Sequence, residues 1–197
     1  KMLKSIVIMG AGGHAKSCVD VIESTGKYRI VGLTGKPSDV GCMVLGYPVI
    51  GTDETLPKLR KKPDCLALGI GSIRSTELRE QCYKKARELG FELPVIVSSS
   101  ATVSVHCKIG AGTIVFHGSV VNASAEIGAC NIINSGSLIE HDAKTGDFCH
   151  ISTGVIINGS TILGDRCFIG SGSVLANNLV VSSNSFIKSG SIVSQNQ

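Results

Sequence analysis

Residues 109–138 read IGAGTI-VFHGSV-VNASAE-IGACNI-INSGSL when they are written in groups of six. Each group opens on an aliphatic residue, and this rhythm runs from Val103 to Val193, with Thr145 as the one departure. A second column, four places behind the first, is made mostly of small residues. The residue after each aliphatic is often Gly or Asn, both of which favour turns. A fixed short period indicates one structural unit that is repeated and stacked.

A period of six matches neither a helix, at about 3.6 residues, nor an alternating strand, at about 2 residues. It fits a short strand and a turn, with one large and one small residue facing inward. Three such units make a triangular coil of about 18 residues, and coils stack at a strand spacing of roughly 4.8 Å. Each coil then buries its aliphatic residues against its neighbours, as in other solenoids. The unbroken period argues against a β-sandwich, which needs turn signals about every 8–12 residues.

Composition divides the chain into two parts. Charged residues and helix formers lie mostly before residue 95, whereas Ser, Gly, Asn and aliphatic residues dominate afterwards. With Ser98-Ser99-Ser100 as a connector, we predict domains at 1–97 and 98–197.

Several classes of function fit the composition poorly. A net charge of +4 and the absence of Trp argue against a nucleic-acid surface. The cysteines show no Cys-x-x-Cys pair, so we expect no metal. There is no long apolar run, and Ser5–Met9 is too short for a signal peptide. We therefore expect a cytoplasmic protein that binds neither nucleic acid nor membrane.

The front of the chain reads as strand, glycine turn, helix and strand. Apolar residues 5–9 lead into Gly10-Ala11-Gly12-Gly13-His14-Ala15, and residues 28–33 form the next strand. This pattern predicts a Rossmann-like α/β domain, with further strands at 48–51, 65–70 and 93–96 and a helix at 75–89. The glycines match G-x-G-x-x-[G/A], which lets a backbone approach a phosphate at a helix N-terminus. The turn either holds a nucleotide-linked ligand or simply joins strand to helix.

One feature of a dinucleotide site is missing from this domain. Such a site has an acid at the end of the second strand to hold a ribose. Here that place reads Leu33-Thr34-Gly35, and no acid comes before Asp39. The dinucleotide interpretation is therefore weak.

The segment Glu140-His141-Asp142 sets an imidazole between two carboxylates on one turn. A neighbouring carboxylate selects the imidazole tautomer and stabilises its charged form, as in many general bases. The alternative is a solvated histidine at a corner of the solenoid.

A Gly-x-Gly-Gly-His-Ala turn followed by a hexapeptide solenoid resembles the sugar acetyltransferases of bacterial glycan biosynthesis. That family includes UDP-4-amino-sugar N-acetyltransferases of the PglD type and sialic-acid O-acetyltransferases of the NeuD type. The resemblance implies that the solenoid is a left-handed parallel β-helix. It also implies that the front domain holds a nucleotide sugar and that acetyl-CoA binds between the β-helices of a homotrimer.

The resemblance also implies roles for individual residues. His141 corresponds to the catalytic base, and Glu140 and Asp142 correspond to the acids that orient it. The residues implied for the substrate are Gly10, Gly12, Gly13, His14 and Asn134. His150 corresponds to a histidine near the acetyl-CoA thioester, and the Gly159 N–H corresponds to a donor facing the acetyl carbonyl. We expect His106 and His117 to be surface residues.

We therefore expect transfer of acetyl from acetyl-CoA to the amino group of a UDP-linked sugar of the 4-amino-4,6-dideoxy type. Acetylation of a sialic-acid hydroxyl and a non-catalytic trimeric scaffold that binds sugar nucleotides are the alternatives. Zinc carbonic anhydrases share this solenoid but need three converging histidines, and the histidine spacing here does not match theirs. Relatives run on into a Gly-x-Pro-Ala-Lys-like tail near the coenzyme, whereas the printed sequence ends at Ser194–Gln197. Either that tail lies beyond the printed sequence or the coenzyme contact is reduced.

Overall fold

The computed structural model describes residues 3–59 and 64–197. The chain divides into two compact units, 1–71 with 77–96 and 72–76 with 97–197. The two functional domains that we predicted, at 1–97 and 98–197, stay predictions. In the described residues, no helix is both long and apolar enough to cross a membrane.

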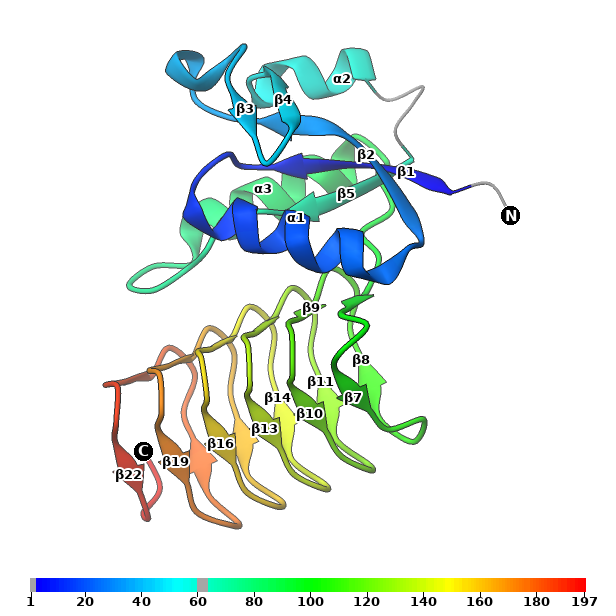
Figure 1. The fold of residues 1–197 in the computed structure, drawn as a ribbon. Helices are drawn as coiled ribbons and strands as arrows, with labels where there is room; N and C mark the ends of the chain where they lie inside the picture. The colour runs from blue at the N-terminus through cyan, green and yellow to red at the C-terminus, as the bar shows by residue number, and fades with distance from the viewer. Residues whose placement is uncertain (1–2, 60–63) are drawn as a thin grey trace. The chain divides into compact units, whose positions relative to one another are not determined.

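The first unit is built around a five-stranded sheet in the order β3-β4-β2-β1-β5 (Figure 1). Its strands are β1 Lys4–Met9, β2 Tyr28–Thr34, β3 Met43–Val44, β4 Tyr47–Gly51 and β5 Cys65–Leu68. All pairs are parallel except the β3–β4 hairpin. The helices are α1 Gly13–Thr25, α2 Leu56–Leu59 and α3 Glu77–Glu88, with 3₁₀ turns at Pro37–Asp39 and Asp53–Thr55. The predicted strand–turn–helix–strand unit is confirmed.

Helix α1 forms after the glycine turn because its apolar residues recur on one face and pack into the core. That face is buried and consists of Ala15, Cys18, Val19, Val21 and Ile22. The helix ends at Gly26, whose φ of 62° is left-handed and favours glycine at a helix C-terminus.

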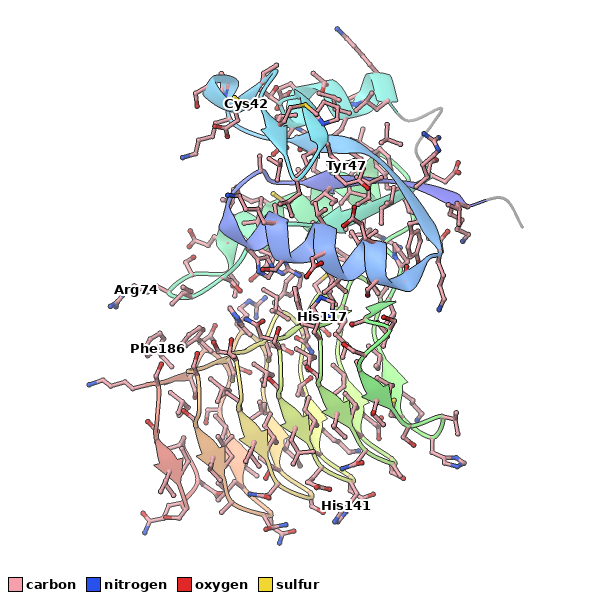
Figure 2. The ribbon with its side chains drawn as sticks, in the orientation of Figure 1. Cys42, Tyr47, Arg74, His117, His141 and Phe186 are labelled. Carbon is pink, nitrogen blue, oxygen red and sulfur yellow. The ribbon has the colours of Figure 1, made fainter. Side chains whose placement is uncertain are left out.

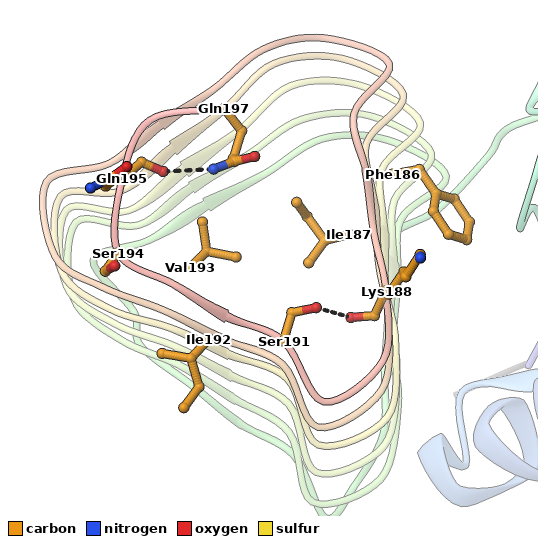
Figure 3. Close-up of a pocket in the computed structure, with 9 residues that line it drawn as sticks. All are labelled: Phe186, Ile187, Lys188, Ser191, Ile192, Val193, Ser194, Gln195 and Gln197. Carbon is orange, nitrogen blue, oxygen red and sulfur yellow. Dashed lines mark hydrogen bonds between the residues drawn. The ribbon is translucent and has the colours of Figure 1, made fainter.

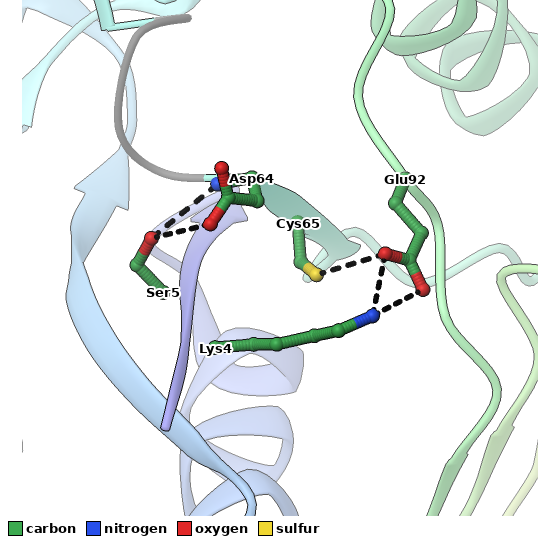
Figure 4. Close-up of polar contacts among 5 residues, drawn as sticks. All are labelled: Lys4, Ser5, Asp64, Cys65 and Glu92. Carbon is green, nitrogen blue, oxygen red and sulfur yellow. Dashed lines mark hydrogen bonds and ion pairs between the residues drawn. The ribbon is translucent and has the colours of Figure 1, made fainter. Parts of the chain in front are cut away.

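A group of polar contacts lies beside β1 and β5 in the first unit (Figure 4). Lys4 Nζ forms an ion pair with Glu92 Oε2 at 2.8 Å, and the Cys65 thiol donates to the same carboxylate at 3.7 Å. Ser5 Oγ donates to Asp64 Oδ2 at 3.4 Å. Lys4 and Glu92 are both more than half exposed, so their ion pair contributes little to stability.

The second unit is a left-handed parallel β-helix with three sheets, here called faces 1, 2 and 3. Face 1 contains β7 Thr102–Val103, β10 Val120–Val121, β13 Leu138–Ile139, β16 Ile156–Ile157, β19 Val174–Leu175 and β22 Ile192–Val193. Face 2 contains β8 Lys108–Ile109, β11 Glu126–Ile127, β14 Lys144–Thr145, β17 Ile162–Leu163 and β20 Val180–Val181. Face 3 contains β6 Ile96–Val97, β9 Ile114–Val115, β12 Ile132–Ile133, β15 His150–Ile151, β18 Phe168–Ile169 and β21 Phe186–Ile187. Partners such as Val120 and Leu138 are 18 residues apart, which confirms the predicted coil.

In each two-residue strand the second side chain points inward and the first outward. The last coil shows this plainly, because Val193 and Ile187 lie inside the triangle while Ile192 and Phe186 lie outside it (Figure 3). The inner column forms one continuous hydrophobic core from Val115 to Val193. At the last coil this core borders a shallow pocket of about 460 Å³.

From Gly112 to Gly190, each corner of the β-helix places one residue in the left-handed region. These residues recur every six positions, at Gly112, Gly118, Ser124, Cys130, Gly136, Asp142, Phe148, Gly154, Ser160, Arg166, Gly172, Asn178, Asn184 and Gly190. They lie three places after the inward aliphatic residue, not at the position directly after it. Where the earlier position is glycine, the next coil packs closely against its backbone. A Cβ on Gly128, for example, would lie 2.5 Å from the carbonyl carbon of Gly146.

The one departure from the aliphatic column, Thr145, has a partner inside the core. Asn131 Nδ2 donates to Thr145 Oγ1 at 2.7 Å and to the Gly146 carbonyl at 2.9 Å. Asn131 Oδ1 accepts the Cys149 N–H. Because Asn131 is fully buried, each of these bonds replaces one that it would make with water.

We expect Asn131→Ala to lower the free energy of unfolding by about 1–3 kcal/mol, because it removes a buried hydrogen-bond network and leaves polar groups unsatisfied. Thr145→Val should lower the free energy of unfolding by less, because it removes one hydrogen-bond acceptor and restores the aliphatic side chain of the repeat. Denaturant unfolding of the three proteins measures both. A larger loss for Thr145→Val would contradict this account.

The β-helix begins earlier than its aliphatic column suggested. We expected 93–96 to be a strand of the front domain, but the strand is β6 Ile96–Val97 and belongs to face 3. Pro94 has no N–H to donate to a ladder, whereas the Ser98 N–H donates to the Val115 carbonyl at 2.9 Å. Val97 stands six places before Val103 and so extends the inward column by one unit.

Candidate functional site

The corner between faces 1 and 2 carries Glu140, His141 and Asp142, directly after β13 (Figure 2). Asp142 has a φ of 60°, a conformation that aspartate tolerates better than most residues. Its Oδ2 lies 2.8 Å from His141 Nδ1. Because an ionised carboxylate only accepts hydrogen bonds, Nδ1 is the protonated nitrogen and Nε2 carries the lone pair. The predicted acid–histidine pair is therefore formed, with Nε2 as the basic atom.

The acids around His141 raise the pKa of its imidazole above the ordinary value. The hydrogen bond to Asp142 is the main cause, and the negative charges of Asp142 and Glu140 add to it. The His141 side chain is 61% exposed, so an incoming substrate can reach it.

Glu140 is held by a residue from the preceding coil. Asn122 Nδ2 donates to Glu140 Oε2 at 2.9 Å, and the His141 N–H also lies 3.3 Å from that oxygen. Asn122 was not among the site residues that we predicted from the sequence. The signal was present, because Asn122 stands 18 residues before Glu140 and therefore stacks on it.

Gly159 lies one coil after His141, against the imidazole. A Cβ at Gly159 would lie 2.8 Å from His141 Cε1 and 3.0 Å from Nε2. Any larger residue would therefore displace the ring from its present position. The present position of the ring depends on glycine here through this close approach alone, since the backbone is not in the left-handed region.

We expect Asp142→Asn to lower the pKa of His141, because the substitution removes the carboxylate that favours the charged imidazole. Asparagine also tolerates the left-handed backbone of this position. An NMR titration of the His141 ring against pH measures the change. An unchanged or higher pKa would show that Asp142 does not control the imidazole.

The first unit contains a cleft of about 910 Å³ at the carboxyl ends of its parallel strands. Its lining includes the glycine turn with His14 and the loops after β2, β4 and β5. Ligands in open α/β sheets bind at this edge. The predicted substrate residues Gly10, Gly12, Gly13 and His14 therefore all line one cleft.

Glycine stands at Gly10 for a different reason than at Gly12 and Gly13. Gly10 has a φ of 112°, and a Cβ there would lie 2.9 Å from Ile70 Cγ1. A Cβ at Gly12 or Gly13 would meet nothing within 4 Å, so packing does not require glycine at either place. An open backbone at the start of α1, with no acid in its first turn, suits a bound anion.

The remaining predicted residues lie away from the His141 corner. Asn134 follows β12, at the corner between faces 3 and 1, on the other side of β13. His150 is in β15 on face 3, where it is buried and its Nδ1 lies 2.6 Å from the Ser72 carbonyl oxygen. A single chain therefore does not bring these two residues to His141.

The two histidines to which we assigned no role differ from each other. His106 is exposed, as expected. His117 is half-buried, and its Nδ1 lies 2.6 Å from Ser98 Oγ. Within the described residues, no group of three or more His, Cys, Asp or Glu side chains is placed to hold a metal ion.

Known families match both parts of the chain. The PglD N-terminal domain family matches residues 5–86, and the bacterial transferase hexapeptide family (six repeats) matches residues 142–177. A comparison with curated proteins finds no match.

Solved structures match nearly the whole chain. Perosamine N-acetyltransferase from Caulobacter crescentus, solved as a histidine-to-asparagine mutant with CoA and GDP-perosamine, is 31% identical. The match covers 99% of this chain and 90% of that chain, with a TM-score of 0.92. The acetyltransferase domain of PglB from Neisseria gonorrhoeae, in complex with acetyl coenzyme A, is 30% identical over 99% of this chain and 93% of that chain, with a TM-score of 0.90. WeeI from Acinetobacter baumannii, at 18% identity over 97% of each chain and a TM-score of 0.73, shares the fold. The chain therefore belongs to the hexapeptide-repeat sugar acetyltransferases of the PglD and NeuD type.

Proposed function

We propose that this protein transfers the acetyl group of acetyl-CoA to the amino group of a nucleotide-linked amino sugar, with His141 as the general base. The observation that carries the proposal is the His141–Asp142 pair, with His141 Nε2 directed toward Gly159 at an exposed corner. The relatives solved with CoA, acetyl-CoA or GDP-perosamine support the choice of both substrates.

The chemistry needs a base because a sugar ammonium is not a nucleophile. His141 Nε2 accepts the proton that the amine loses as it attacks the thioester carbonyl. Collapse of the tetrahedral intermediate then breaks the carbon–sulfur bond, and CoA leaves as the thiol with that proton. Asp142 stabilises the imidazolium that forms, and Asn122 keeps Glu140 beside the same corner. General acid–base catalysis of this kind contributes about 10²–10⁴-fold.

The tetrahedral oxyanion that forms during the attack needs a donor. The backbone N–H of Gly159 is suited to this, because Gly159 lies against the imidazole and its N–H, within the described part of the chain, donates to no backbone carbonyl. Losing one such donor in other enzymes costs about 3 kcal/mol of transition-state stabilisation. Transfer is direct and has no covalent enzyme intermediate, so holding both substrates in position is a large part of the catalysis.

The nucleotide part of the substrate fits the front cleft. The N-terminus of α1 at Gly12 and Gly13 faces the diphosphate, and Lys36 supplies a cation on the lining of the cleft. The resemblance favours a UDP sugar of the 4-amino-4,6-dideoxy type. The GDP-linked sugar of the Caulobacter relative is the matched alternative.

We further propose that the active form is a homotrimer. The outward residues of face 1 are apolar from β10 to β22, namely Val120, Leu138, Ile156, Val174 and Ile192. Ile192 is 83% exposed in the single chain, and burying such a stripe between copies removes apolar surface from water. A neighbouring copy would also bring Asn134 or His150 toward a corner that they cannot reach within one chain.

Release of free thiol from acetyl-CoA tests the proposal. The acceptors are a UDP-4-amino-4,6-dideoxy sugar, GDP-perosamine and free sialic acid, each tried with wild-type protein and with Asp142→Asn. Release with an amino-sugar nucleotide, and not with sialic acid, supports N-acetylation. Release with sialic acid alone would move the assignment to O-acetylation. Silence with every acceptor, while acetyl-CoA still binds, would favour a non-catalytic scaffold.

A further inference from the structure

The front cleft lacks the acid that a nucleotide-binding sheet usually supplies at the end of its second strand. β2 ends at Thr34, and Gly35 follows it. A Cβ at Gly35 would lie 3.0 Å from both Ala11 Cβ and Asp39 Oδ2. An acidic side chain at this position would force the glycine turn or the Asp39 loop to move. The usual place for the acid is thus closed by packing.

Asp39, the next acid in the sequence, is already engaged by its own loop. Its Oδ2 accepts the Lys36 N–H at 2.9 Å, and its Oδ1 accepts the Ser38 hydroxyl at 3.2 Å. These bonds cap the 3₁₀ turn Pro37–Asp39. Asp39 lines the cleft, but both of its oxygens are used to hold the loop in shape.

Asp53 reaches the same edge of the sheet from the neighbouring strand. β4 lies beside β2, with Gly51 in register with Thr34, and Asp53 follows two residues later. The Thr34 hydroxyl is fully buried and donates to Asp53 Oδ1 at 2.6 Å. Among the described residues, Asp53 Oδ2 accepts no hydrogen bond, and Asp53 lines the cleft. One oxygen is therefore anchored while the other is available to a ligand.

We infer that Asp53 takes the place of the missing acid and accepts a hydrogen bond from a ribose hydroxyl of the bound nucleotide, an assignment that rests on the proposed function. An ionised carboxylate can only accept hydrogen bonds, so its partner on the ligand must be a donor, and a ribose hydroxyl is one. The buried Thr34 hydroxyl holds the carboxylate in one orientation, so little side-chain freedom is lost when the ligand binds. The acid thus follows β4, the strand next to β2, and binds the ribose as an acid after β2 would.

The inference can be tested by calorimetric titration of the full chain. The ligands are UDP, GDP and the 2′-deoxy and 3′-deoxy analogues of each. A hydrogen bond to a charged group corresponds to a change in Kd of about 10- to 100-fold. We expect at least one deoxy analogue to bind wild-type protein that much more weakly than its parent. In Asp53→Asn, the parent nucleotide should bind as weakly as the deoxy analogue binds to wild-type protein, so that parent and analogue are no longer distinguished. The reason is that the amide keeps an oxygen to accept from Thr34 but presents NH₂, a donor, to the ribose.

Two further variants make the test specific. Thr34→Val keeps the carboxylate but removes its anchor, so it should reduce the ribose preference even if Asp53→Asn does not fold. Asp39→Asn tests the competing acid, and we expect it to retain the preference. Thermal unfolding of each variant checks that the fold is intact.

The outcomes separate this inference from the proposed function. Equal binding of parent and deoxy nucleotides to the wild type would overturn the role of Asp53 while leaving the nucleotide site in place. A preference that survives Asp53→Asn, or that disappears in Asp39→Asn, would overturn it as well. Failure of wild-type protein to bind either UDP or GDP would overturn the nucleotide site itself, and the inference with it.

Discussion

Replacing His141 with alanine should reduce acetyl transfer by about 10²–10⁴-fold, the contribution of a general base, with little change in stability. The side chain is 61% exposed, and its hydrogen-bond partner Asp142 is 57% exposed, so neither leaves a buried group unsatisfied. The inward column of the β-helix is untouched. We expect kcat to fall while the Kd for acetyl-CoA stays close to the wild-type value.

A thiol-release assay gives kcat, calorimetry gives the Kd, and thermal unfolding shows that the variant is folded. His106→Ala is the matched control, because His106 is an exposed histidine elsewhere on the same β-helix. Wild-type turnover in His141→Ala, or an equal loss in His106→Ala, would remove His141 from the mechanism.

Gly159→Ala should lower kcat by about 10²-fold, the cost of misplacing a catalytic group by about 1 Å. The added methyl group would lie 2.8 Å from His141 Cε1. Because the imidazole is at the far end of an exposed side chain, it moves and the coil does not. The fold therefore survives, while His141 Nε2 leaves the position set by Asp142.

Measurement of kcat together with an NMR titration of the His141 ring distinguishes this effect from a general loss of stability. Displacing the ring weakens its bond to Asp142, so the pKa of His141 should fall toward its ordinary value. Ala123→Ser is the matched control, since it adds one atom in the same column on the coil before His141. Unaltered kcat in Gly159→Ala would mean that this contact does not position the base.

The fold could be predicted from the sequence because its signal is repeated. An inward aliphatic residue every six positions predicts the 18-residue coil, and the structure pairs Val120 with Leu138 as that coil requires. The corner geometry could not be predicted in the same way, because residues as different as Phe148 and Arg166 occupy the left-handed region. There the coil imposes φ on whatever side chain is present.

The candidate site could be predicted where its residues are neighbours in sequence or stand one 18-residue coil apart. Glu140-His141-Asp142 is continuous, so the acid–histidine pair was visible. Asn122 acts on this corner from the coil before it. Asp53 has no sequence signal at all, since its relation to Thr34 depends on β4 lying next to β2. That order is decided by tertiary packing, which the pattern of residues 28–51 does not reveal.

The buried Asn131–Thr145 pair distinguishes one coil from the others. Because the coils of a solenoid are nearly identical, a coil can stack on the wrong neighbour, shifted by one coil, with little loss of apolar burial. In such a misaligned chain, the Asn131 amide would face an aliphatic residue such as Leu163 in place of the Thr145 hydroxyl. An amide buried without its acceptor costs about 1–3 kcal/mol, which penalises the shifted pairing but not the native one. We therefore expect the Asn131–Thr145 pair to favour the native stacking of the coils over the shifted one.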